Sequence, residues 1–380
     1  MKKRPMGKRI KILYTIPNFD TAGSGKVVYD LVKGLNRSIF EPEICCFHSK
    51  GKFYREIEKL NLKIHLFPFA TPYRPFITLP FRVLKIRRFF KKNRFDIIHS
   101  WHWSSDFTEP LGARLAGIPF VYTKKAMGWG NKAWIWRSKL STKIIAINSD
   151  MMSQFFKTMT HKTVQMPLGV DTEDYKPGLE RDLSLSKLQL NQDDFIIVSV
   201  ANLVAVKGIE ILIKAVNELN DAAVKVLIIG SDDNEYGEML KSTYQSDSIE
   251  FLGKKEDVRP YLALADVFVI PTKDEGRKEG MPIAPLEAMA SGRIVLGSRI
   301  SGIKDILAPF ENCLFEPSNT RKLSEKIKLI KGMSISEREA LANAMRAHVL
   351  QNLSIEKCIT DHEDLYKTLV EPKKALNQSK

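Results

Sequence analysis

The chain has 380 residues and a mass of 43.3 kDa, which is too long for one compact core and corresponds to two or three domains. Its 44% hydrophobic and 27% charged residues are typical of a globular protein and exclude a mostly disordered chain. No apolar run approaches the roughly 18 residues that a membrane-spanning helix needs. The basic N-terminus continues into a short alternating run that contains Lys11 and no small-residue cleavage site. We therefore expect a first strand there, and no signal peptide.

The four cysteines, Cys45, Cys46, Cys313 and Cys358, show no C-x-x-C spacing. Neither a disulfide framework nor a zinc site is favoured, and we expect a protein of the reducing cytoplasm.

The positive charge is concentrated in the first part of the chain. Residues 1–165 hold 31 basic and 10 acidic side chains, whereas the rest hold 28 and 34. Residues 71–95 contain eight basic residues and no acid, and from Leu79 their apolar positions have helical spacing. Such a basic amphipathic helix is either a solvated helix packed on its own domain or a patch that binds an anionic membrane surface. Nucleic-acid binding would be supported by charge alone, and we do not expect it.

Short apolar runs alternate with helical segments along the chain. We predict strands at 11–16, 95–100, 119–123 and 143–148, each with a helix after it or nearby, and a second series at 195–201, 225–230, 249–253, 266–271, 294–298 and 313–317. Residues 337–370 are predicted to be helical. This alternation predicts parallel sheets covered by helices, and hence an α/β protein with two Rossmann-like domains joined by a polar linker near 172–194.

A glycine-rich segment, Gly23-Ser24-Gly25-Lys26, follows the first strand. It lacks the first glycine of a P-loop and the hydroxyl residue after the lysine, because these positions are Asp20 and Val27. The segment is either a simple tight turn or a turn that lets a substrate approach the backbone and the N-terminus of a helix.

Residues 273–292, KDEGRKEGMPIAPLEAMASG, follow the strand predicted at 266–271. The Gly280-Met281-Pro282 turn should open a helix from about Ala284 to Ala290, and free N–H groups there would favour an anion. Glu287 lies among apolar residues of this helix, where a carboxylate needs a polar partner such as a sugar or ribose hydroxyl. Glu279 precedes the turn, so both carboxylates could flank one ligand.

This segment resembles the E-x7-E signature of retaining family-4 glycosyltransferases, which have the GT-B fold. Further resemblances are residues 201–212 (ANLVAVKGIEIL), the LGVD at 168–171, the ADVFVIP at 265–271, and the strand-end glycines Gly230 and Gly253. The resemblance covers Ile12 to Tyr366 and is most specific in residues 195–317. It implies two facing Rossmann-like domains with a cleft between them.

The resemblance also implies an NDP-sugar as co-substrate, bound without metal, and no cofactor. Lys207 would contact the diphosphate, Glu279 the hydroxyls of the transferred sugar, and Glu287 the ribose. Gly280, Met281, Pro282 and Ile283 would bring backbone to the donor, and Gly230 would lie nearby. The alternatives are a solvated lysine in a turn for Lys207 and a helix-terminal carboxylate for Glu279. No D-x-D-type motif stands at a strand end, and Asp232-Asp233 is expected to be a loop.

The sequence departs from the family pattern at three positions. Asn202 stands where the family has an arginine before Lys207, and Arg277 would supply the missing positive charge. Lys125 stands in place of the family's histidine near the donor sugar, and Leu168 in place of its linker asparagine. His99 and His102 end a predicted strand, where sites collect in such sheets, although a packed structural histidine is the better interpretation.

We therefore predict a domain of residues 1–170, completed by a C-terminal helix at about 355–372, that holds the acceptor side with Gly23, Ser24, Gly25 and His102. Residues 171–354 would bind the donor, and Glu279, Lys207 and Lys125 would be catalytic. The predicted activity is retaining, metal-independent transfer of a sugar to a saccharide or lipid-linked acceptor in surface polysaccharide or glycolipid synthesis, at the inner face of the plasma membrane. A UDP-sugar epimerase and a non-catalytic sugar-nucleotide-binding protein are the alternatives.

Overall fold

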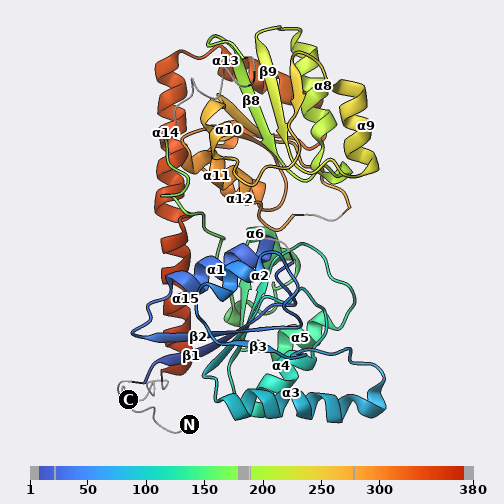
Figure 1. Ribbon diagram of the computed structural model, residues 1–380, viewed down its shortest axis with the longest axis vertical. Helices are drawn as coiled ribbons and strands as arrows, with labels where there is room; N and C mark the ends of the chain where they lie inside the picture. Colours follow the sequence, from blue (N-terminus) through green and yellow to red (C-terminus); the bar gives the residue numbers. More distant parts are fainter. Residues whose placement is uncertain (1–7, 21–22, 179–187, 189, 277–278, 372–380) are drawn as a thin grey trace. The chain divides into compact units, whose positions relative to one another are not determined.

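The computed structural model describes residues 8–20, 23–178, 188, 190–276 and 279–371. The chain divides into two compact units (Figure 1). Unit 1 comprises Met1–Ile147, Met151–Met166 and Cys358–Lys380, and unit 2 comprises Asn148–Asp150 and Pro167–Lys357. Each unit is an α/β domain built on one parallel sheet, as the alternation of strands and helices predicts.

The sheet of unit 1 has the strand order β3-β2-β1-β4-β5-β6-β7. Its strands are β1 (Ile10–Thr15), β2 (Phe40–Cys46), β3 (Ile64–Leu66), β4 (Ile97–Ser100), β5 (Phe120–Lys124), β6 (Lys143–Ala146) and β7 (Thr163–Gln165). β1 pairs in parallel with both β2 and β4, with Ile12 opposite Pro42 and Ile97. The strand order therefore reverses between β1 and β4, and in open α/β sheets ligands bind at the carboxyl ends of the strands at such a point.

Helices cover both faces of this sheet. Figure 1 shows α1 (Gly23–Gly34) and α2 (Tyr54–Glu58) on one side and α3 (Leu79–Asn93) and α4 (Thr108–Ala116) on the other. Unit 1 also contains η1 (Phe76–Thr78), α5 (Trp134–Leu140) and η2 (Thr160–Lys162), and α6 (Ser149–Gln154) begins in unit 2 and ends in unit 1. The last helix, α15 (Ile355–Val370), packs its Tyr366 into unit 1, where the hydroxyl lies 2.9 Å from Tyr14 Oη and 2.6 Å from His99 Nδ1.

The sheet of unit 2 has the order β10-β9-β8-β11-β12-β13. Its strands are β8 (Phe195–Val200), β9 (Val224–Ile229), β10 (Ile249–Phe251), β11 (Val267–Ile270), β12 (Ile294–Ser298) and β13 (Leu314–Phe315). The helices are η3 (Ala205–Lys207), α8 (Ile209–Leu219), α9 (Glu235–Tyr244), α10 (Arg259–Leu264), α11 (Ala284–Ala290), α12 (Ile303–Ile306), η4 (Glu311–Cys313), α13 (Thr320–Lys331) and α14 (Ile335–Asn352). Here the order reverses between β8 and β11, where Ile197 is opposite Val267.

The basic segment of unit 1 forms η1 and α3 as an amphipathic pair. Val83, Ile86 and Phe90 are buried, and Phe89 stacks on Phe67 with ring centroids 4.0 Å apart, so neither Phe89 nor Phe90 is free to enter a membrane. Arg82 donates to Thr71 Oγ1 at 3.0 Å and to the carbonyl oxygens of Pro72 and Pro75, which gives it a structural role within this segment. None of the described helices is long and apolar enough to cross a membrane.

Candidate functional site

In unit 2 the loops that follow β8 and β11 bring Lys207 and Glu279 together. Lys207 ends η3, and its ammonium forms an ion pair with the carboxylate of Glu279. The two side chains are 17% and 27% exposed, so a ligand can reach the pair. The pair lies among the loops at the reversal of the strand order, which is where such sheets bind ligands.

A second lysine, Lys273, lies beside this pair, and the sequence analysis did not single it out. Its backbone N–H donates to the Val206 carbonyl at 2.8 Å, which joins the two loops. Its Nζ is 2.5 Å from Glu210 Oε1. The hydrogen bond to Glu210 raises the pKa of Lys273, although partial burial acts in the opposite direction. Because Glu210 balances its charge, Lys273 contributes less positive potential than its position suggests.

The turn of residues 280–283 is fixed by contacts within unit 2. The Gly280 carbonyl accepts a hydrogen bond from Asn148 Nδ2 at 2.5 Å, and Met281 Sδ accepts one from the Leu168 N–H at 3.2 Å. Met281 is buried, so its side chain anchors the turn. The helix that follows, α11, has only seven residues.

Glu287 on α11 is half-buried, and its polar partner is Tyr175. Burial raises the pKa of Tyr175, and the charge of Glu287 and the hydrogen bond between them act in the same direction. The phenol therefore stays protonated and donates to the carboxylate. Arg346 Nη1 donates to the Tyr175 carbonyl at 3.3 Å and also to the Ala290 carbonyl. No sequence signal marked Tyr175, because it lies far from Glu287 in the chain.

The remaining donor-side predictions fall in different surroundings. Asn202 is exposed in the loop after β8. At Gly230 an added Cβ would lie 1.7 Å from the Ala201 carbonyl oxygen, so close packing of the strand ends already requires glycine. Arg277 lies outside the described residues.

In unit 1 the structure brings Lys125 and Ser24 together. Lys125 follows β5, and its Nζ donates to Ser24 Oγ in the first turn of α1 at 3.0 Å. Gly23 is exposed. Gly25 is buried, and an added Cβ would lie 3.0 Å from the Phe19 ring, so a larger residue would need this ring to shift.

The two histidines after β4 differ in environment. His99 is fully buried and hydrogen-bonded to Tyr366 and Thr123, which makes it a structural residue. Burial lowers the pKa of His102 to about 3, and the charges of Arg137 and Lys125 act in the same direction. His102 Nδ1 is buried and has no hydrogen-bond partner among the residues that the structure describes. The imidazole is therefore neutral at physiological pH.

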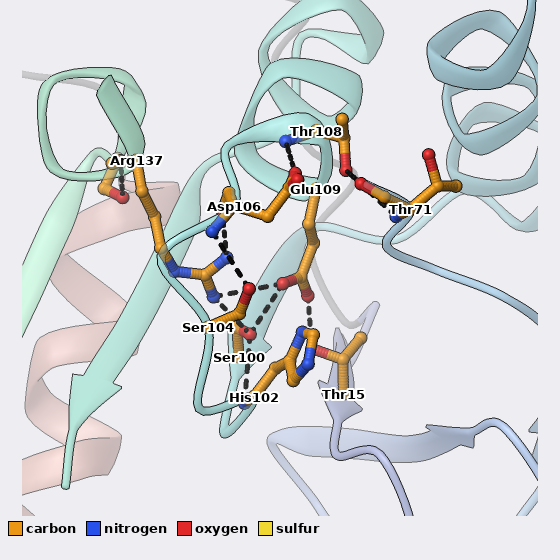
Figure 2. Close-up of polar contacts among 10 residues, drawn as sticks. Thr15, Thr71, Ser100, His102, Ser104, Asp106, Thr108, Glu109 and Arg137 are labelled. Atoms are coloured by element: carbon orange, nitrogen blue, oxygen red, sulfur yellow. Dashed lines mark hydrogen bonds and ion pairs between the residues drawn. The ribbon is translucent and has the colours of Figure 1, made fainter. Parts of the chain in front are cut away.

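Beside His102 lies a buried polar network at the reversal point of this sheet (Figure 2). Glu109 accepts hydrogen bonds from Thr15 Oγ1 at 2.5 Å and from Ser100 Oγ at 2.8 Å. Thr15 ends β1 and Ser100 ends β4, so the network joins the two central strands. Arg137 on α5 donates to both Glu109 and Ser100.

Within the part of the chain that the structure describes, no group of three or more histidine, cysteine or acidic side chains is arranged to hold a metal ion.

Comparison with known proteins gives the class of this chain. The family description "Glycosyl transferases group 1" matches residues 180–348, and "Glycosyltransferase Family 4" matches residues 21–174. The chain is 96% covered by a glycosyltransferase structure from Rickettsia africae, with a TM-score of 0.83 over all of that chain and 18% identity, which shows a shared fold. The protein is therefore a glycosyltransferase with the two-domain GT-B fold. The two family descriptions match different parts of the chain, and both describe glycosyltransferases.

Two curated relatives are similar to this chain in sequence. One is the GDP-mannose-dependent monoacylated alpha-(1-6)-phosphatidylinositol monomannoside mannosyltransferase of Corynebacterium glutamicum, 33% identical over 200 residues, which are 50% of this chain and 52% of the relative. The other is the UDP-Gal:alpha-D-GlcNAc-diphosphoundecaprenol alpha-1,3-galactosyltransferase of Escherichia coli, 25% identical over 315 residues, which are 76% of this chain and 79% of the relative.

Proposed function

We propose that this glycosyltransferase moves a sugar from a nucleoside-diphosphate donor to a saccharide or lipid-linked acceptor, with retention of configuration and without a bound metal. The observation that carries the proposal is the ion pair of Lys207 and Glu279 beside the anchored turn of residues 280–283, at the carboxyl ends of β8 and β11.

The pair suggests how a donor would bind. A diphosphate would take the place of Glu279 beside Lys207, because a doubly charged anion competes well for the ammonium. Glu279 would then accept hydrogen bonds from hydroxyls of the transferred sugar. Glu287 would accept from the ribose hydroxyls while keeping the hydrogen bond of Tyr175. Backbone groups of Gly280 to Ile283 would complete the contact.

Retention requires the acceptor hydroxyl to reach the anomeric carbon from the face that the diphosphate leaves. The protein then mainly positions both substrates and stabilises the departing charge. Lys207 would supply that charge. Lys125, held by Ser24 in unit 1, is the second basic group that we assign to the reaction.

The relatives support the nature of both substrates. One is named for GDP-mannose and a phosphatidylinositol mannoside, and the other for UDP-galactose and a sugar linked to diphosphoundecaprenol. Both names combine a sugar nucleotide with an acceptor that carries a lipid. We therefore propose a lipid-linked acceptor and docking of unit 1 on an anionic membrane surface.

The structure offers one surface for such docking, which we call the η1–α3 ridge. On it Phe76, Ile77 and Phe81 are 60%, 84% and 75% exposed. The exposed basic residues around them are Arg74, Lys85, Arg88, Lys91 and Lys92. Apolar side chains surrounded by basic ones are typical of shallow binding to anionic lipid.

The reaction is tested by incubating the protein with UDP-, GDP- and ADP-sugars and a lipid-linked saccharide. A transferase releases free nucleoside diphosphate and forms a glycosylated product. An epimerase would convert the donor without release, and a binding protein would do neither. The anomeric proton of the product in NMR reports whether configuration is retained, and an inverted product would refute that part of the proposal.

A further inference from the structure

Unit 1 contains a pocket with a cavity volume of about 520 Å³ that no role described above explains. Three chain segments and Phe47 line it: residues 70–74 before η1, residues 102–106 after β4, and residues 130–131 before α5. The pocket lies at the carboxyl end of β4, beside the point where the strand order reverses. All of its lining belongs to unit 1.

The lining combines aromatic rings with polar groups. The indole of Trp103 is 51% exposed. Tyr73 and Phe47 are held by stacking on Phe107 and Phe69, with ring centroids 5.6 and 4.6 Å apart. The polar residues His102, Asp106 and Asn131 line the same pocket. Rings pack against the apolar C–H face of a sugar, whereas the polar groups bind its hydroxyls.

The buried network holds the walls of the pocket in place. Arg137 Nη1 donates to the Asp106 carbonyl at 2.9 Å, and the Thr108 N–H donates to Asp106 Oδ1 at 2.7 Å (Figure 2). Thr108 Oγ1 also donates to the Thr71 carbonyl at 2.8 Å, which ties the first segment to the second. The N–H groups of Gly130 and Asn131 donate to Ser105 Oγ at 3.0 and 3.2 Å.

The rim of the pocket carries Arg74, whose guanidinium lies 5.7 Å from the centre of the Tyr73 ring. Phe76 and Ile77 of the η1–α3 ridge follow directly in the chain. A cationic group therefore stands between a sugar-sized pocket and an apolar surface. The pocket, the guanidinium and the apolar surface thus follow one another in the same order as the sugar, the phosphate and the lipid of a lipid-linked saccharide.

We propose that this pocket binds the phosphate-linked sugar of the acceptor. Trp103 stacks on the sugar ring, the His102 imidazole forms a hydrogen bond with one hydroxyl, and Arg74 contacts the phosphate. The assignment rests on the proposed transfer to a lipid-linked saccharide and goes beyond it by naming the acceptor pocket and its chemistry.

The experiment is saturation-transfer NMR on the full chain. The probes are the methyl glycosides and the glycosyl 1-phosphates of glucose, galactose, mannose and N-acetylglucosamine. We expect at least one sugar to bind, more tightly as the 1-phosphate. Trp103→Ala and His102→Leu should each weaken the binding of that sugar about tenfold, both as the methyl glycoside and as the 1-phosphate. Arg74→Ala should abolish the preference for the 1-phosphate and leave the methyl glycoside unchanged. Trp136→Ala is the matched control, because this indole is 58% exposed on α5 and does not line the pocket.

Binding of the sugar nucleotide is measured on the same samples. If the nucleotide binds and no glycoside does, or if the glycoside binds equally to the Trp103→Ala and Trp136→Ala variants, the pocket assignment is wrong and the proposed transfer stands. If no sugar nucleotide binds, the proposed function fails, and glycoside binding that depends on Trp103 still supports a saccharide pocket.

Discussion

Arg137 Nη2 lies 3.1 Å from Glu109 Oε2, and neither side chain has any exposed surface. Burial raises the pKa of the Glu109 carboxyl, while Arg137 and the hydroxyls of Thr15 and Ser100 stabilise its ionised form. Arg137 also lies over the rings of Phe120 and Tyr122, with its guanidinium carbon 5.5 and 5.2 Å from their centres. The ion pair therefore joins β1, β4, α4 and α5 at the base of the proposed acceptor pocket.

Replacing one partner of this pair should destabilise unit 1 strongly. In Glu109→Gln the shape is kept, but Arg137 stays buried without a counter-charge, which costs about 3–5 kcal/mol. All five tryptophans lie in unit 1, so urea unfolding followed by tryptophan fluorescence reports on this unit. The exposed pair of Lys322 and Glu325 provides the control, and Glu325→Gln should change this unfolding curve by less than about 1 kcal/mol. Equal midpoints for both variants would show that the buried pair is dispensable.

The sequence predicted the site of unit 2 in more detail than that of unit 1. Residues 266–292 carry strand, turn and helix signals in one continuous stretch, and α11 has the predicted bounds of Ala284 and Ala290. The network of unit 1 depends on Thr15, Ser100, Glu109 and Arg137, which come from four separate elements. No local pattern marks such residues, because their partners are chosen by the tertiary fold.

The sequence analysis did not predict β2, β3 and β7, and the structure shows why. In β2 the residues Glu41, Pro42 and Glu43 interrupt the apolar run, and Glu43 is accepted in the sheet because Lys11 lies 2.7 Å and His65 2.5 Å from its carboxylate. β3 and β7 have only three residues each. Gly230 also has a packing role, because an added Cβ would lie 1.7 Å from the Ala201 carbonyl oxygen, and its assignment to the donor stays a prediction, as does that of Gly25 to the acceptor.

The donor site makes a prediction about Lys207 and Glu287. Replacing either by alanine should weaken use of the sugar nucleotide by roughly ten- to a hundredfold, because each removes a contact of about 1.5–3 kcal/mol. The control is Lys214→Ala on the exposed face of α8, which removes a positive charge from the same region. Titration calorimetry with the preferred donor measures the effect. If Lys207→Ala and Glu287→Ala are folded and bind the donor normally, the assignment of the donor site to unit 2 is wrong.

Chelation tests the role of metal. We expect transfer to continue at an unchanged rate in EDTA, because Lys207 supplies the charge that Mg²⁺ supplies in other enzymes. Product formation is measured with and without the chelator, and with added Mg²⁺ or Mn²⁺. Loss of activity in EDTA with recovery on adding either ion would show that the diphosphate needs a metal.

His102 should make unit 1 sensitive to mild acid. Its pKa is about 3 in the folded protein and about 6.5 when unfolded, so between these values the unfolded chain binds the extra proton. The free energy of unfolding should therefore fall as the pH is lowered below about 6.5. Between pH 7 and pH 5, the free energy of unfolding of the His102→Gln variant should therefore fall by up to about 2 kcal/mol less than that of the wild type. Urea unfolding monitored by fluorescence measures this difference. The contributions of the other buried histidines to the pH dependence cancel, because both proteins contain them. Parallel stability curves would show that His102 takes up its proton equally in both states.

The last prediction is that the η1–α3 ridge docks unit 1 on an anionic membrane. Each basic residue close to an anionic leaflet contributes about 1 kcal/mol, and this attraction falls off within the Debye length. The triple variant Lys85→Glu, Arg88→Glu, Lys92→Glu should therefore lose most of its binding to vesicles of phosphatidylglycerol and phosphatidylcholine. Arg82 is left intact, because its hydrogen bonds hold residues 71–75.

The exposed apolar residues of the ridge are tested separately. Phe76→Ser, Ile77→Ser, Phe81→Ser should remove the binding that survives high salt, since apolar insertion is not screened. The matched control is Lys214→Glu, Lys322→Glu, Lys328→Glu, which changes the net charge equally on exposed positions of unit 2. Vesicle co-sedimentation at low and high salt measures all three variants. If the unit 2 control loses as much binding as the ridge variant, net charge alone governs adsorption and the ridge is not the docking surface.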